Sequence, residues 1–412
     1  MSGIVHIIGA GVAGLSAATK LAEWGREIQV HEAGRMAGGR CRSYFDQQLG
    51  LTIDNGNHLL LACNHAAMAY LERIGSVDAL VGPHECVFDF IDLGAGERWR
   101  LHPNAGQAPW WIFSNARRVP GTNVLDYLAG VRLLLANDRA TVTQALTPRG
   151  ALWDRLWKPV LVSALNTQLD EASAKLAAAI VRESLGAGGK AARPRVPKHG
   201  LGSAFIDPAL AYLTARNAGV RYGDRLRALH FSDARVVVLD FGDRVVALGG
   251  EDAVILATPA WTAAELVPGL QTPTEHRAIL NAHFAMTPPY GMPLLTGVVG
   301  GLTEWLFAFP DRLSVTISAA DALIDSARDD IAETIWREVA AIARLGNAPM
   351  PPFRIVKEKR ATFAATPAQD ALRPGVHTHW NNLFLAGDWT QTGLPATIEG
   401  AIRSGARAAE FV

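Results

Sequence analysis

Three glycines near the start of the chain have the spacing of a loop that binds the phosphates of a dinucleotide. They follow an apolar stretch, residues 4–8, that predicts a buried strand, and they precede an apolar helical pattern over residues 15–22. A second predicted strand, residues 28–31, ends at the acidic Glu32. A glycine loop in this setting is the pattern of a Rossmann-type βαβ unit. The loop consists of Gly9, Ala10, Gly11, Val12, Ala13 and Gly14.

Each position in this pattern has a physical reason. Gly9 permits a tight turn, Gly11 lets a pyrophosphate approach the backbone, and Gly14 allows the helix to pack closely on the strand. The helix N-terminus offers N–H groups and a positive dipole to the phosphates. Glu32 would accept hydrogen bonds from the ribose hydroxyls, and its charge disfavours a 2′-phosphate. A purely structural glycine turn is the less favoured interpretation.

The residues after Glu32 indicate FAD rather than NAD. Ala33 follows directly, and the later run of Gly38, Gly39 and Arg40 offers backbone amides and a cation to the diphosphate. A polar turn comes next and would lie near the edge of the isoalloxazine ring. Such a turn alone is more often only a turn, but in this order it predicts a third FAD contact. The contact residues of this turn are Asn55, Gly56, Asn57 and His58.

These motifs, in this order, resemble the flavin amine oxidase and carotenoid desaturase superfamily. A predicted strand at residues 383–386, followed by Gly387 and Asp388, resembles its closing motif. The resemblance implies that Asp388 binds the ribitol of FAD. It also implies that a helix beginning at Thr397 and Ile398 points its N-terminus at the flavin ring, where the dipole would stabilise negative charge. In proteins of this type a strand around Leu226 touches the adenine.

The fold class predicted from these patterns is α/β, with a Rossmann-like FAD-binding domain of the glutathione reductase type. This domain is interleaved with a mixed α+β domain that encloses the substrate. We expect residues 1–85, 198–265 and 376–412 to form the FAD-binding domain, and residues 86–197 and 266–375 to form the substrate domain. Helices are predicted at residues 124–135, with a broad apolar face, from 152 past 165, and at 172–185, and a glycine- and proline-rich linker at 186–200.

The middle of the chain resembles one branch of the superfamily. Residues 157–173 are similar to a segment of the bacterial hydroxysqualene dehydroxylases. The resemblance implies loss of an allylic hydroxyl from hydroxysqualene, with hydride from reduced flavin, to give squalene for hopanoids or sterols. Such a site needs an apolar tunnel for a C30 chain, aromatic side chains and a proton donor. The alternatives are a phytoene-type desaturase on the same scaffold and a flavin amine oxidase.

Several side chains in these segments have both a functional and a structural interpretation. His58 could donate the proton, although a hydrogen-bonded turn residue is favoured. Trp157 and Asn166 could line the substrate pocket, but on one straight helix they would point in opposite directions. Residues 110–113, two tryptophans, an isoleucine and a phenylalanine beside two arginines, fit a membrane-docking patch and a buried segment equally well. Cys41 lies between two arginines, which could lower its pKa, but a packed thiol is favoured.

Composition limits the remaining classes of function. Hydrophobic residues make up 49% of the 412 residues, but no run is long enough for a transmembrane helix. The 39 basic and 39 acidic residues cancel, so no net charge points to nucleic acid. The three cysteines have no metal-like spacing, which favours a reducing cytoplasm and predicts no metal site. The expected partner is a lipophilic C30 isoprenoid, with the protein in the cytoplasm and in peripheral contact with the inner face of the membrane. The sequence does not indicate the oligomeric state or the electron donor.

Overall fold

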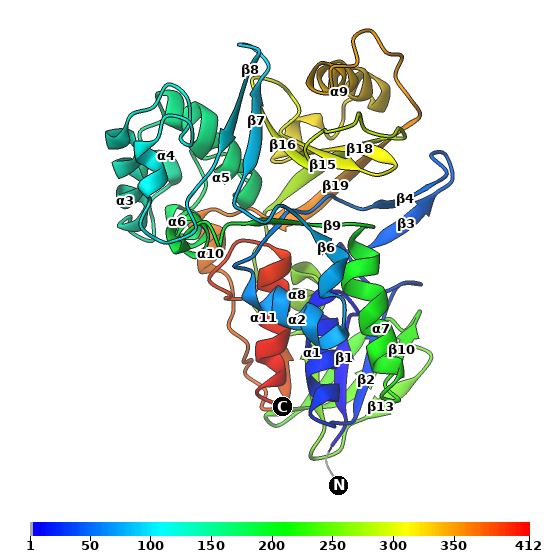
Figure 1. Cartoon of the computed structure of the whole chain (residues 1–412). Helices are drawn as coiled ribbons and strands as arrows, with labels where there is room; N and C mark the ends of the chain where they lie inside the picture. Colours follow the sequence, from blue (N-terminus) through cyan, green and yellow to red (C-terminus); the bar gives the residue numbers. More distant parts are fainter. Residues whose placement is uncertain (1–2) are drawn as a thin grey trace.

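A five-stranded parallel sheet carries the first glycine loop in the computed structural model, which describes residues 3–412. Its members, in spatial order, are β10 (Val220–Tyr222), β2 (Ile28–Glu32), β1 (Val5–Ile8), β14 (Ala253–Leu256) and β20 (Leu383–Leu385). Each neighbouring pair is parallel. Strands from the beginning, middle and end of the chain therefore form one sheet, as Figure 1 shows in its lower half.

Helices cover one face of this sheet, and a small antiparallel sheet lies on the other. The helices are α1 (Val12–Glu23), α2 (His65–Ile74), α7 (Asp207–Thr214) and α11 (Ile398–Ala409). The small sheet consists of β11 (Ala228–Ser232), β12 (Arg235–Asp240) and β13 (Val245–Ala247). Helices α1 and α11 touch so closely that a Cβ on Gly405 would lie 2.0 Å from the carbonyl oxygen of Ala13. This contact joins the C-terminal helix to the first glycine loop.

A chain of polar side chains is buried between the parallel sheet and the small sheet. His6 Nδ1 lies 3.1 Å from His31 Nε2, and His31 Nδ1 lies 2.7 Å from Asp224 Oδ2. Arg244 donates to the same Asp224 oxygen at 2.6 Å. Burial lowers the pKa of His6 to about 4 and also lowers the pKa of His31. Both imidazoles are therefore neutral near pH 7.

We expect this histidine pair to make the fold sensitive to acid. Because the pKa of His6 is lower in the folded state than its ordinary value of 6.5, the stability it contributes is present above pH 6.5 and is lost as the pH falls toward 4. The loss is about 3 kcal/mol by the usual linkage relation. Thermal unfolding measured across this range should show a shallower decline for His6→Leu than for the parent. The control variant is His84→Leu, because His84 is exposed. If the decline of stability with falling pH were the same in His6→Leu as in the parent, His6 would not be the source of the acid sensitivity.

A seven-stranded sheet forms the upper half of the molecule (Figure 1). In spatial order it contains β19 (Phe353–Phe363), β15 (His276–Phe284), β18 (Arg312–Ile317), β17 (Trp305–Phe309), β16 (Leu295–Val299), β7 (Phe88–Asp92) and β8 (Glu97–Leu101). Helix α9 (Arg328–Ile342) packs its apolar side chains on one face of this sheet. We call the opposite face the inner face. The parallel sheet with its helices and this seven-stranded sheet together confirm the predicted α/β fold class.

The helical part of the middle segment lies beside this sheet, toward the left of Figure 1. It comprises the turns η2 (Trp110–Phe113) and η3 (Val124–Leu128), the helices α3 (Ala129–Leu134) and α4 (Val142–Ala145), the π-helical turn η4 (Trp153–Trp157), and the helices α5 (Lys158–Leu165) and α6 (Ala174–Glu183). The helix predicted over 124–135 is thus a 3-10 turn followed by a short α-helix. The helix predicted past residue 165 instead ends there, because Asn166 adopts a left-handed conformation with φ 49°.

Short elements complete the fold and correct the predicted linker. Within residues 186–200, β9 (Pro194–Pro197) pairs with β5 (Leu60–Leu61) and β6 (Leu80–Val81), so this segment is part of a sheet. A hairpin of β3 (Ser43–Asp46) and β4 (Leu51–Asp54) precedes the polar turn. The others are η1 (Val77–Ala79), η5 (Leu185–Ala187), η6 (Gly202–Ile206), α8 (Ala260–Leu266), η7 (Ala320–Leu323) and α10 (Pro367–Ala371). No helix within residues 3–412 combines the length and the apolar character needed to cross a bilayer.

Candidate active site

The geometry of the first glycine loop fits a pyrophosphate. Gly9 has φ +109°, and a Cβ there would lie 2.6 Å from the carbonyl oxygen of Ala257. A Cβ on Gly14 would lie 1.9 Å from the carbonyl oxygen of Gly9, so position 14 in the first turn of α1 accepts only glycine. A Cβ on Gly11, by contrast, would meet no described atom within 4 Å. Gly11 therefore faces open space at the N-terminus of α1, where a phosphate could reach the backbone.

Glu32 and the second pair of glycines lie against this loop. The Glu32 carboxylate accepts hydrogen bonds from the backbone N–H of Ala10 at 2.9 Å and of Gly34 at 2.7 Å. Ala33 is the residue between Glu32 and Gly34. Gly38 donates to the carbonyl oxygen of Ala10 at 2.8 Å. The three segments therefore form a continuous backbone cradle, in which Val12 and Ala13 begin helix α1.

Arg40 and Asp388 bring the two ends of the chain together. Arg40 Nη2 donates to Asp388 Oδ1 at 2.7 Å, although 348 residues separate them. The sequence predicts that Arg40 contacts the diphosphate and that Asp388 contacts the ribitol. The ion pair shows that the two side chains lie next to each other. Nearby, the Thr397 side chain accepts from the N–H of Gly400 at 3.0 Å and so caps helix α11, whose first residue is Ile398.

The polar turn at residues 54–58 binds the inner face of the seven-stranded sheet. Asn57 Nδ2 donates to Thr316 Oγ1 at 3.2 Å, and the backbone N–H of Asn57 donates to Asn281 Oδ1 at 3.3 Å. A Cβ on Gly56 would lie 3.2 Å from the Asn281 amide nitrogen. Asn55 Nδ2 donates to Glu358 Oε2 at 3.1 Å. These contacts join the proposed flavin site to the seven-stranded sheet.

The inner face changes from polar to aromatic across the sheet. Side chains paired across neighbouring strands point to the same face. One such row begins at Asn281 and Thr316, beside the polar turn, and continues through Trp305 and Phe90 to Trp99. Phe90 stacks on Trp99 with ring centroids 5.3 Å apart and meets Trp305 edge-on at 5.7 Å. The row therefore connects the polar turn to three buried aromatic side chains, Trp305, Phe90 and Trp99, which we call the aromatic surface.

A buried carboxyl group lies at the start of β17, beside this aromatic surface. Glu304 Oε2 accepts from the N–H of Ser318 at 2.7 Å, and its carboxyl group also hydrogen-bonds the Ser163 hydroxyl. Trp305 Nε1 donates to the same Ser163 oxygen. Burial raises the pKa of Glu304 to about 7, so the group can hold a proton near neutrality. Sequence analysis missed Glu304, because a single acidic residue between apolar strands has no motif.

His58 has the surroundings of a hydrogen-bonded turn residue, and Cys41 has those of a packed thiol, as the sequence favoured. His58 Nδ1 lies 3.2 Å from the carbonyl oxygen of Gly56 and fixes the polar turn. Burial lowers the His58 pKa, which disfavours a protonated imidazole at neutral pH. Burial raises the pKa of the Cys41 thiol, in spite of the neighbouring Arg40.

Leu226 lies near the ribose-binding acid, although not on a strand. It is buried in the connection between β10 and β11, and the N–H of Asp224, two residues earlier, donates to the carbonyl oxygen of Glu32 at 2.9 Å. The strand expected around Leu226 begins only at Ala228. The contact of Leu226 with the adenine stays a prediction.

Trp157 and Asn166 have different surroundings. Trp157 is buried in the aromatic core, and its Nε1 has no hydrogen-bond partner within residues 3–412. The Asn166 amide is fully used, because it donates to Thr362 Oγ1 at 2.9 Å and accepts from the N–H of Ala319 at 2.6 Å. Trp157 is therefore a core residue, and its place in the substrate pocket stays a prediction, whereas Asn166 connects helix α5 to the sheet.

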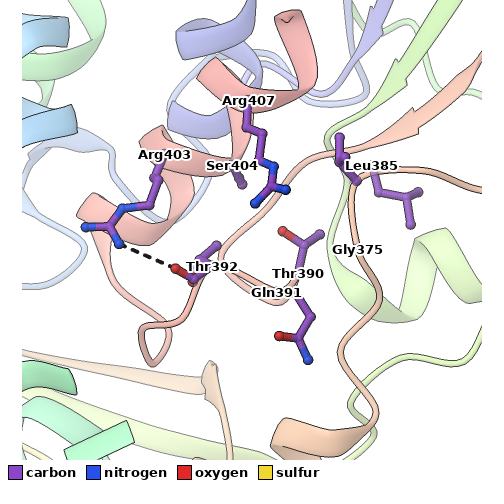
Figure 2. Close-up of a pocket in the computed structure, with 9 residues that line it drawn as sticks. Gly375, Leu385, Thr390, Gln391, Thr392, Arg403, Ser404 and Arg407 are labelled. Atoms are coloured by element: carbon purple, nitrogen blue, oxygen red, sulfur yellow. Dashed lines mark hydrogen bonds between the residues drawn. The ribbon is translucent and has the colours of Figure 1, made fainter. Parts of the chain in front are cut away.

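A small cavity lies beside α11, next to the segment that carries Gly387. Figure 2 shows Arg403, Ser404 and Arg407 on the helix, facing the loop that carries Thr392. Arg403 Nη1 donates to the Thr392 carbonyl oxygen at 3.4 Å and Nη2 to Glu183 at 2.9 Å. The cavity volume is about 110 Å³, below the size of typical ligand pockets, and no predicted FAD residue lines it. It is not a candidate for the flavin or for a C30 chain.

Comparison with known proteins identifies the family of this chain. A family model described as flavin containing amine oxidoreductase matches residues 12–412. The chain belongs to this family. It is 56% identical over 413 residues to a hydroxysqualene dehydroxylase from Rhodopseudomonas palustris, with 100% of this chain and 99% of the relative covered. A hydroxysqualene dehydroxylase from Sinorhizobium fredii is 51% identical over 407 residues, covering 99% and 97%.

Solved structures of low sequence identity share the fold. An oxidoreductase from Methanosarcina mazei superposes with a TM-score of 0.71 at 16% identity and covers 99% of this chain and 100% of its own. As a member of a flavin-containing family, the chain uses FAD, and the glycine cradle, Glu32 and Asp388 supply groups that fit this cofactor.

Proposed function

We propose that this protein converts hydroxysqualene to squalene, as a step toward hopanoids or sterols. The observation that carries the proposal is the 56% identity, over the whole chain, to a protein named hydroxysqualene dehydroxylase. The inner face supports it, because an aromatic surface suited to a polyisoprenoid adjoins the polar turn at the flavin site. In this proposal residues 1–85, 198–265 and 376–412 hold FAD, and residues 86–197 and 266–375 enclose the substrate.

The reaction replaces an allylic hydroxyl group by hydrogen and releases water. Reduced FAD, when bound, supplies the hydride. The protein must hold the hydrocarbon chain, deliver one proton to the departing oxygen and keep water from the positive charge that develops on carbon. In this proposal Trp305 and Phe90 offer π faces to that charge, and Trp157 packs in the same core.

We assign the proton to Glu304 in preference to His58. Glu304 has a pKa of about 7 and lies at the aromatic surface, with Ser163 fixing its carboxyl group. His58 has a lowered pKa and a hydrogen bond to its own turn. We therefore propose that His58 shapes the turn near the flavin, and that Glu304 protonates the hydroxyl group.

The substrate we propose is a lipophilic C30 chain, which resides in membranes. We accordingly propose that the protein is cytoplasmic and makes peripheral contact with the inner face of the cytoplasmic membrane. Burial of each methylene of such a chain contributes about 0.8 kcal/mol, so desolvation would drive substrate binding.

The assay that tests this function uses purified, flavin-loaded protein reduced in the absence of oxygen. We expect hydroxysqualene to exchange its hydroxyl group for one hydrogen atom, so that the product is lighter by one oxygen atom and has the mass of squalene. Phytoene and a primary amine, offered to the oxidised protein, are the controls and should remain unchanged. Conversion of either control substrate without formation of squalene would refute the proposal in favour of a desaturase or an amine oxidase.

A further inference from the structure

We infer that one face of the helical part, formed by η2, η3 and α3, docks on a bilayer that contains anionic lipid. Six exposed apolar side chains form this docking face: Trp110, Phe113, Leu125, Leu128, Val131 and Leu135. Their exposed fractions run from 51% for Val131 to 79% for Leu135. Large apolar side chains gathered on one surface mark an interaction site. The purpose of docking rests on the proposed function, since a C30 substrate would arrive from the membrane, but the surface itself does not.

The segment from η3 to α3 is mostly apolar, and Asp126 and Arg132 are its only charged residues. Leu133 is fully buried in the aromatic core, and a Cβ on Gly130 would lie 3.5 Å from the Trp157 ring. Leu125, Leu128 and Leu135 nevertheless remain uncovered. Apolar side chains therefore lie both on the side that packs on the core and on the side that is uncovered, and the uncovered leucines favour an apolar partner. This helix therefore separates the docking face from the aromatic core.

The turns that carry the docking face are held together from within. Trp111, which is buried, meets the Tyr127 ring edge-on at 5.1 Å, and the Tyr127 hydroxyl accepts from the N–H of Val119 at 3.0 Å. These inner contacts turn Trp110 and Phe113 outward, with their rings 6.2 Å apart. Residues 110–113 thus combine both interpretations of the sequence, because two of the side chains are buried and two are exposed. In Figure 1, α3 lies at the outer edge of the upper half, far from both termini.

The charges around this face favour an anionic surface. Residues 110–139 contain four arginines and two aspartates, a net charge of +2 in a chain whose formal net charge is zero. One of the aspartates, Asp126, is occupied by capping Asn123. Apolar and aromatic side chains surrounded by arginine are typical of protein surfaces that lie in the bilayer interface. A second copy of the chain would instead bring two positive patches together, so we favour the membrane.

Vesicle flotation of the full-length, FAD-loaded protein tests this inference. We expect binding to vesicles of phosphatidylcholine with phosphatidylglycerol, and weaker binding to phosphatidylcholine alone. The variant Leu125→Gln/Leu135→Gln should lower the partition coefficient about 10-fold or more, because two apolar side chains no longer enter the interface. Val245→Gln/Tyr290→Gln is the matched control: both side chains are exposed, at 65% and 108%, and lie outside the docking face. This control should bind as the parent does.

Two results would overturn the inference. One is equal vesicle binding by the parent and the leucine variant. The other is a parent that is dimeric without lipid, with only the leucine variant monomeric, which would make the face an interface between copies. Turnover of detergent-dispersed hydroxysqualene separates this test from that of the proposed function. The leucine variant should keep detergent-phase activity and lose activity on vesicles, whereas an inactive parent that still binds vesicles would refute the function and leave the docking face standing.

Discussion

Glu32→Ala protein is expected to purify without the yellow colour of bound flavin. The Glu32 carboxylate holds the N–H groups of Ala10 and Gly34 and is placed to accept the two ribose hydroxyls of the adenosine. Hydrogen bonds to a charged group contribute about 1.5 to 3 kcal/mol each, so loss of two should lower FAD affinity about 10²-fold to 10⁴-fold. The measurement is the ratio of visible flavin absorbance to protein absorbance, followed by FAD titration of the apoprotein.

Two further variants show whether the charge or the side-chain contact is responsible. Glu32→Gln keeps one acceptor oxygen and should lose less affinity than Glu32→Ala. Glu27→Ala removes an exposed carboxylate at the opposite end of β2 that makes no predicted cofactor contact, and its flavin content should equal that of the parent. Undiminished flavin in Glu32→Ala would show that the adenosine does not bind at this strand end.

The cofactor cradle could be predicted from sequence because its residues obey local rules. A left-handed Gly9 and a Gly14 with no room for a Cβ leave glycine as the only residue at these positions, and their spacing is fixed by one strand and one helix. The C-terminal motif follows the same logic, since Thr397 caps α11 through its own side chain. Such features need no knowledge of distant parts of the chain.

The substrate side depends on pairing between distant strands, which periodicity does not reveal. Asn281, Thr316 and Trp305 share one row only because β15, β18 and β17 adopt a particular register. The exposed apolar face of α3 was also beyond sequence analysis. An apolar helical pattern predicts burial, and only the fold shows that one side of this helix meets no other part of residues 3–412.

Glu304→Gln should abolish most turnover while leaving FAD binding intact. The amide has nearly the shape of the carboxyl group but cannot release a proton to the departing hydroxyl. General acid catalysis contributes about 10²-fold to 10⁴-fold, and we expect kcat to fall by this amount. Flavin content and thermal stability serve as controls for folding. His58→Asn should lose far less activity, because it removes a contact within the turn and not the proton donor.

The pH dependence of the parent provides an independent test of Glu304. A general acid acts in its protonated form, and the pKa of Glu304 is raised to about 7, so kcat/KM should fall as the pH rises above 7. The hydrogen bond from Ser163 stabilises the ionised carboxylate and lowers the pKa of Glu304. Ser163→Ala should therefore move the descending limb to higher pH, a change that lost packing alone would not produce. If the fall of kcat/KM above pH 7 were unchanged in Glu304→Gln, another group would be responsible for the titration. If this fall moved only in His58→Asn, His58 would be the proton donor.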